Sequence, residues 1–111
     1  MRNNLVYLRH IRDAIEKVEK YLGDTTFEVF SQNDMMVDAV VRELEIIGEA
    51  ARNLSDEFCE KHSRIWWSSI RGMRNVLIHE YFGIDLNIIW DTCKNNLPEL
   101  RNFVVMILGD K

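Results

Sequence analysis

The stretch Ile70-Arg71-Gly72-Met73-Arg74-Asn75-Val76-Leu77-Ile78-His79 predicts a helix with two different faces. Each helical residue turns by about 100°, so one arc of roughly 60° collects an apolar stripe: Trp66, Ile70, Met73 and Leu77. The opposite arc of about 140° collects polar residues: Arg71, Arg74, Asn75 and His79. Ile78 lies in the middle of that polar arc. The stretch therefore predicts a helix that packs one face against a core and presents guanidinium, amide and imidazole groups on the other.

Apolar spacing elsewhere predicts further helices. Residues 4–22 form one, ended by Gly23, and a second starts at Asn33 or Asp34 and runs to about residue 53. A short helix opens at Ser55 and ends near residue 62, and Asp85 caps the last one. The apolar rhythm of that last helix passes Pro98 without losing phase, which predicts one long kinked helix or two coaxial pieces rather than a reversal. We expect a single all-α domain over residues 1–111, an antiparallel up-and-down bundle of four to five helices.

The helix at residues 33–53 carries more apolar surface than one contact needs. Besides a core stripe, it has a second apolar stripe: Met35, Ala39, Ile46 and Ala50. Either this is a central helix contacted on two sides within one chain, or the second stripe is a subunit interface. We favour the interface, which together with Ile78 predicts a two-fold homodimer.

Charge is distributed unevenly along the chain. The net charge of −4 and the pI near 5.3 argue against a general nucleic-acid-binding protein. Between Glu60 and Glu80, however, no acid occurs, whereas four basic residues do: Lys61, Arg64, Arg71 and Arg74. A local basic patch suits a phosphate-containing ligand held at one place. The alternative is that these cations pair with acids on neighbouring helices.

Other features narrow the class of protein. No apolar run approaches the roughly 20 residues that span a bilayer, and the first residues do not resemble a signal peptide, so we expect no membrane association. Cys59 and Cys93 are two thiols without a disulfide framework, which indicates a reduced, cytoplasmic protein. Cys59 and His62 have the spacing of a metal-ligand pair, but no second pair follows, so we predict neither a metal site nor a cofactor.

The order Arg-x4-His-x-Tyr, at Arg74, His79 and Tyr81, resembles the signature of HEPN-domain ribonuclease toxins of the HepT type. Residues 42–51 and 85–90 also resemble that family, in the expected order, so the likeness covers nearly the whole chain. The resemblance implies an all-α HEPN dimer that cleaves RNA without a metal, with Arg74 and His79 as catalytic residues. It also implies a type VII-like toxin–antitoxin system, in which a minimal nucleotidyltransferase is the antitoxin and transfers AMP to Tyr81.

The residue types fit that chemistry. RNA carries its own nucleophile, the 2′-hydroxyl, so an enzyme need only move protons and stabilise charge on phosphorus. His79 can move protons near neutral pH, and Arg74 can hold the phosphate through paired N–H donors. We assign supporting, phosphate-binding roles to Arg71 and Asn75, and expect an RNA substrate such as tRNA or mRNA. A single imidazole is a limited acid–base set, and a dimer would bring two of each group to one cleft.

Two alternatives remain open. In the first, the chain is a non-catalytic subunit that binds a nucleotide or substrate for a nucleotidyltransferase, with Arg74 and His79 as binding groups. In the second, His79 and Tyr81 only end a helix and hydrogen-bond locally. The second alternative must also explain why Arg71, Arg74 and Asn75 share the face of His79.

Overall fold

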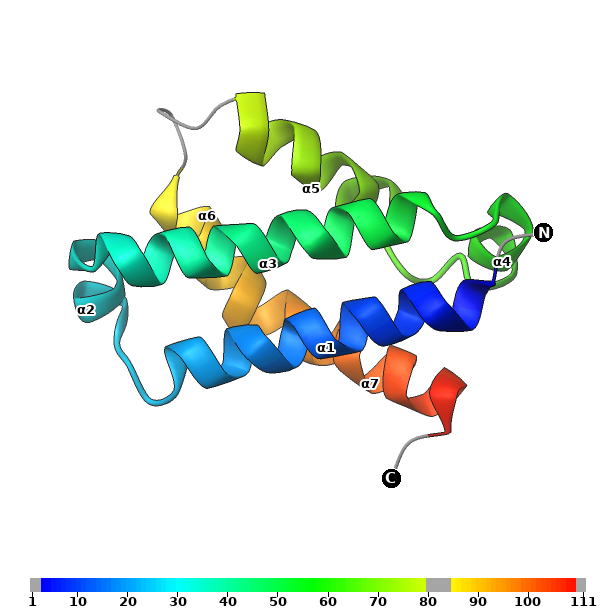
Figure 1. Cartoon of the computed structure of the whole chain (residues 1–111), viewed down its shortest axis with the longest axis horizontal. Helices are drawn as coiled ribbons and strands as arrows, with labels where there is room; N and C mark the ends of the chain where they lie inside the picture. The colour runs from blue at the N-terminus through cyan, green and yellow to red at the C-terminus, as the bar shows by residue number, and fades with distance from the viewer. Residues whose placement is uncertain (1–2, 80–84, 110–111) are drawn as a thin grey trace.

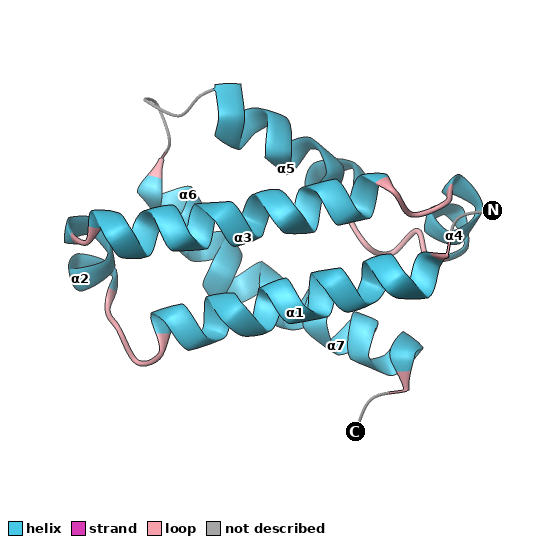
Figure 2. Cartoon of the chain, viewed as in Figure 1, coloured by secondary structure: helices cyan, strands magenta, loops and turns pink. Residues whose placement is uncertain are grey.

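The structure, a computed structural model, describes residues 3–79 and 85–109, and the side chains among them outside 74–79. In this part, helices are joined by short loops and turns, and all regular secondary structure is helical (Figure 2). The elements in order are α1 (Asn4–Leu22), α2 (Phe27–Gln32), α3 (Asp34–Arg52), α4 (Asp56–Lys61), α5 (Trp67–His79), α6 (Leu86–Asp91), the π-helical turn η2 (Thr92–Asn96) and α7 (Leu97–Leu108).

Side-chain caps determine where most of these helices begin. In each case a side-chain oxygen accepts a hydrogen bond from a backbone N–H two or three residues later, which satisfies a donor that the helix itself leaves free. The capping residues are Asn3, Thr26, Asn33, Ser55 and Asp85. At the end of α1, Gly23 has a φ of 50°, a conformation that favours glycine. The predicted boundaries at Gly23, Asn33 and Asp85 are therefore confirmed.

The long helices alternate in direction. In Figure 1, α3 runs back alongside α1, α5 returns along the other side of α3, and the α6–η2–α7 run passes back behind them. Apolar residues of α1, α3 and α7 fill the space between these elements, together with Phe30 of α2 and Ile70 of α5. The predicted all-α, up-and-down bundle is confirmed.

The run from α6 to α7 is continuous through Pro98, as the unbroken apolar phase predicted. Proline lacks a backbone N–H and crowds the preceding turn of an α-helix. The wider η2 turn lies directly before it, and there the N–H of Leu97 donates to the carbonyl of Thr92, five residues back. The chain thus accommodates Pro98 at the start of α7 without reversing direction.

α3 is the central helix, since it packs against α1 on one side and α5 on another. The members of the second apolar stripe therefore differ in how much of each side chain is exposed to solvent. Ala50 is only 4% exposed within the single chain, and Ala39 and Ile46 are partly buried, whereas Met35 is 82% exposed. Contacts within one chain therefore account for Ala50, and the predicted dimer interface now depends on the more exposed members of the stripe.

The tryptophan prediction needs a correction. The helical arc placed Trp66 in the core stripe, but α5 begins at Trp67, and Trp67 is the buried one. The indole N–H of Trp67 donates to the carbonyl of His62 at 3.0 Å, and its ring packs edge-on against Phe58 and Phe103. Trp66 is half-buried at the rim of this cluster.

Candidate functional site

The motif helix is intact to its last predicted residue. α5 runs from Trp67 to His79 as one helix, so Arg74 and His79 have helical spacing. The side chains of Arg74, Asn75, Ile78 and His79 lie outside the described residues, as does Tyr81. The first half of α5 is anchored on α3, because Ile70 is fully buried there and Met73 packs against the core.

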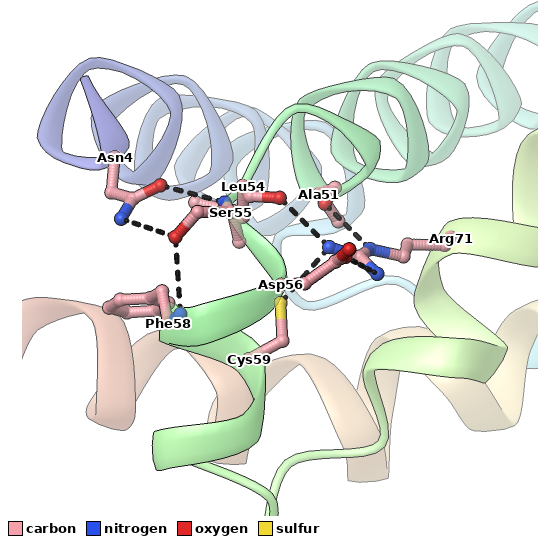
Figure 3. A network of polar contacts seen from close by, with 8 residues as sticks. All are labelled: Asn4, Ala51, Leu54, Ser55, Asp56, Phe58, Cys59 and Arg71. Carbon is pink, nitrogen blue, oxygen red and sulfur yellow. Dashed lines mark hydrogen bonds and ion pairs between the residues drawn. The ribbon is translucent and has the colours of Figure 1, made fainter. Parts of the chain in front are cut away.

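Among the described side chains of α5, Arg71 makes the most extensive polar contacts (Figure 3). Its Nε donates to the carbonyl of Ala51 at 3.0 Å, and its Nη2 donates to the carbonyl of Leu54 at 2.9 Å. Its Nη1 lies 3.5 Å from a carboxylate oxygen of Asp56. The C-terminus of a helix carries free carbonyls and partial negative charge, so a guanidinium is a favourable partner for the end of α3.

These contacts change the role of Arg71. The sequence assigned it to phosphate binding because it shares the polar arc of Arg74 and His79. Most of its N–H donors are directed at α3 and α4 instead, and its charge is paired with Asp56. We therefore leave Arg71 out of the phosphate-binding set and regard it as the residue that fixes α5 on α3.

Cys59 belongs to the same polar network. Its sulfur accepts a hydrogen bond from Nη2 of Arg71 at 3.2 Å. Burial raises the pKa of the Cys59 thiol above its usual value, and the guanidinium of Arg71 opposes this shift in part. The thiol is therefore neutral near pH 7 and contributes a weak acceptor to the junction. The His62 ring contacts Phe58 and Phe103.

A second set of hydrogen bonds holds the α3–α4 junction. The side chain of Asn4 donates to the hydroxyl of Ser55 at 3.1 Å and accepts from the Ser55 N–H at 2.9 Å. The same hydroxyl accepts from the N–H of Phe58 at the start of α4. These bonds connect α1 to the turn from which α5 is then positioned (Figure 3). Sequence reasoning missed Asn4, whose only signal was its place at the start of a helix.

The contact between Arg71 and Ala51 sets the register of α5 on α3. Because the two helices run in opposite directions, later turns of α5 lie beside earlier turns of α3 (Figure 1).

Glu43 of α3 is a buried carboxylate. It is seven residues before Ala50, so both residues lie on the same side of α3. Glu43 is only 4% exposed, which is unusual for a carboxylate. It was not singled out from the sequence, because its neighbours resemble an ordinary amphipathic helix.

Lys61 and Arg64, the other members of the predicted basic patch, are exposed. The Arg64 guanidinium lies 5.7 Å from the centre of the Phe103 ring, at the distance of a cation–π contact. The predicted basic patch therefore loses Arg71, whose charge is paired with Asp56.

Comparison with known proteins identifies the family of this chain. The family model described as ribonuclease HepT-like matches residues 11–107, a range that contains α5 in full. The chain belongs to the HepT-like ribonuclease family. That membership agrees with the resemblance seen in the sequence. Within the described residues, no helix is both long enough and apolar enough to cross a membrane.

Curated relatives of this HepT-like chain come from bacteria and archaea. A protein of Caldanaerobacter subterraneus, named provisionally as an RNase, is 47% identical over 92% of the chain and 91% of its own length. A probable ribonuclease HepT of Thermococcus cleftensis is 40% identical over 90% of the chain and 91% of its own length.

A longer relative comes from Methanocaldococcus jannaschii and is named as a gamma-glutamylcyclotransferase and, provisionally, an RNase. It is 42% identical over 95% of the chain, and the chain spans 47% of that relative's length. No solved structure matched the chain.

Proposed function

We propose that this chain is a ribonuclease that cleaves RNA with Arg74 and His79 as its catalytic residues. The observation that carries the proposal is the family match over residues 11–107, which contains the whole motif helix. The relatives from Caldanaerobacter and Thermococcus are named as ribonucleases, and they align with nearly the whole chain.

The reaction requires few protein groups. His79 removes the proton of the 2′-hydroxyl, whose oxygen attacks the adjacent phosphorus, and a second imidazole returns a proton to the departing 5′-oxygen. An imidazole suits both steps because it exchanges protons near neutral pH. Arg74 holds the phosphate and stabilises the charge that develops on its oxygens. The cationic guanidinium supplies this stabilisation, so we propose that no metal ion takes part.

The spacing of these two residues favours a dimer. They are five residues apart on one helix, which separates them by about 140° around the axis and about 7.5 Å along it. A second copy related by a two-fold axis would place one copy's Arg74 near the other copy's His79 and supply the second imidazole. We propose that exposed Met35 and the partly buried Ala39 and Ile46 contribute to this interface with Ile78.

Asn75 remains a supporting residue in the proposal. It follows Arg74 directly and precedes His79 by one helical turn, so an amide there can hydrogen-bond either the imidazole or a phosphate oxygen. We propose no such role for Arg71, because its guanidinium is hydrogen-bonded to carbonyls of α3 and of the turn after it.

Single substitutions test the catalytic assignment. Arg74→Ala and His79→Ala should each abolish cleavage of RNA while the circular-dichroism spectrum stays helical. Arg101→Ala is the matched control, since that arginine is paired with Glu16 and Glu19 on α1, and it should retain activity. If the unmutated chain bound a nucleotide but cleaved no RNA, the binding-subunit alternative would replace the ribonuclease.

We further propose a partner: a small nucleotidyltransferase that inactivates this toxin by transferring AMP to Tyr81. The support is the family membership and the place of Tyr81 in the sequence, two residues after His79. Each transferred AMP adds a phosphodiester, and so a negative charge, close in sequence to Arg74. That charge and bulk would compete with the RNA phosphate for the same cation.

A further inference from the structure

A shallow pocket of about 400 Å³, widely open to solvent, lies between α4 and the start of α5. α4 contributes Asp56, Cys59 and Glu60 to its wall, and the start of α5 contributes Trp67, Ser68 and Arg71. Trp66, just before α5, also lines it. The volume falls within the roughly 300–1,000 Å³ that is typical of small-molecule sites. Because the pocket is open on one side, one aromatic heterocycle could lie in it with its outer face in solvent.

The two tryptophans of the pocket differ in what their rings contact. Trp67 is 5% exposed and packs against Phe58 and Phe103. Trp66 is half-buried, and no ring contact within the described part of the chain involves it. The Trp66 side chain packs in part against the buried core, and its exposed part can take a further flat partner. Single-stranded nucleic acids are commonly bound by stacking a base on such a ring.

The polar groups of the pocket favour a base over a phosphate. Arg71, the basic residue in the wall, is paired with Asp56, so Glu60 leaves the pocket with an uncompensated negative charge. A carboxylate repels phosphate oxygens, but it accepts hydrogen bonds from the exocyclic amino groups of adenine and cytosine. The exposed Ser63 and Ser68 add hydroxyls that can donate or accept.

We infer that this pocket binds one amino-bearing nucleobase of a single-stranded RNA, with Trp66 as the stacking surface and Glu60 as the acceptor for the amino group. The inference rests on the proposed function, because it takes the ligand to be the RNA. Trp66 precedes Arg74 by eight residues, about 12 Å along a helix. A strand with one base in the pocket can therefore continue to the proposed catalytic residues, and the pocket would influence where the RNA is cut.

Binding of uncleavable RNA tests the stacking surface. Oligonucleotides with 2′-O-methyl groups lack the nucleophile, so their affinity for the full chain can be measured by fluorescence anisotropy with Arg74 and His79 in place. Trp66→Leu keeps an apolar side chain at the rim but has no ring, and it should weaken binding by about 5- to 150-fold. Trp66→Phe should retain most of the affinity. Tyr21→Ala, an exposed aromatic at the far end of α1, is the control and should change nothing.

Base preference tests the role of Glu60. The unmutated chain should bind oligo-A and oligo-C more tightly than oligo-U, and Glu60→Ala should remove that preference. Equal affinities for Trp66→Leu and Tyr21→Ala, or a preference that survives Glu60→Ala, would overturn the inference. A chain that cleaves RNA but shows either result would contradict only the base site. A chain that binds RNA through Trp66 without cleaving it would contradict only the ribonuclease.

Discussion

Removing the Arg71 guanidinium should destabilise the protein without removing its chemistry. Arg71→Ala removes the guanidinium hydrogen bonds to the carbonyls of Ala51, in α3, and Leu54, in the turn after α3. A hydrogen bond that involves a charged group contributes about 1.5–3 kcal/mol. The Arg71 side chain is 27% exposed, so water replaces part of each bond. The ion pair with Asp56 adds little, because that carboxylate is 88% exposed and exposed pairs contribute roughly 0–1 kcal/mol.

We therefore expect Arg71→Ala to lower the free energy of unfolding by about 2–4 kcal/mol, a large part of the roughly 5–15 kcal/mol that a domain has. Urea denaturation followed by circular dichroism measures this change, and an unaltered m-value would show that the two-state comparison is valid. Arg71→Lys should recover only a minor part, because an ammonium cannot span both carbonyls as the planar guanidinium does.

Arg101→Ala is the comparison, since its ion pairs with Glu16 and Glu19 are long and partly exposed. It should change the free energy of unfolding by less than about 1 kcal/mol. The reasoning is refuted if Arg71→Ala destabilises the protein no more than Arg101→Ala does. A second result would also refute it: a fully folded Arg71→Ala protein that has lost RNA cleavage, because Arg71 would then act on the substrate.

Three further predictions concern assembly, regulation and a buried thiol. Ile46→Glu should convert a dimer into a folded monomer or a much weaker dimer, and sedimentation that shows a concentration-independent monomer for the unmutated chain would exclude the interface. Tyr81→Phe should still cleave RNA but gain no AMP-sized mass from the partner nucleotidyltransferase and ATP; an equal gain would place the acceptor elsewhere. Burial raises the pKa of the Cys93 thiol from 9.0 to about 12, so it should resist a thiol reagent at pH 8 until the protein unfolds. The raised pKa also means that this thiol's contribution to stability is complete below pH 9 and is lost as the pH rises toward 12, a dependence that Cys93→Ala should remove.

The helices could be predicted from the sequence because their determinants are local. Side-chain caps such as Asn33 and Asp85 and the apolar spacing that passes Pro98 act within a few residues, so they can be recognised without knowing the fold. The role of Arg71 could not be predicted in this way. Its carbonyl partners are 17 and 20 residues away, in the turn after α3 and in α3 itself, and only the packing of α5 on α3 shows that its guanidinium lies against them.

The same limit explains the errors about apolar residues. Periodicity assigns Ala50 to a second stripe, but it does not say whether another helix of the same chain or a second subunit covers that stripe. The apolar periodicity also does not tell which of the two adjacent residues, Trp66 or Trp67, is buried. Trp67 is the buried one because its indole N–H reaches the carbonyl of His62, a contact set by the turn between α4 and α5.

The nature of the RNA ends tests the central claim most directly. If His79 activates a 2′-hydroxyl without a metal ion, cleavage in the presence of a chelator should leave a 2′,3′-cyclic phosphate on one fragment and a 5′-hydroxyl on the other. Mass spectrometry of a short RNA incubated with the protein distinguishes these ends. A single 2′-deoxy nucleotide on the 5′ side of the cut should block the reaction. Fragments with 3′-hydroxyl and 5′-phosphate ends, or cleavage that stops in chelator and returns with a divalent metal, would contradict the account.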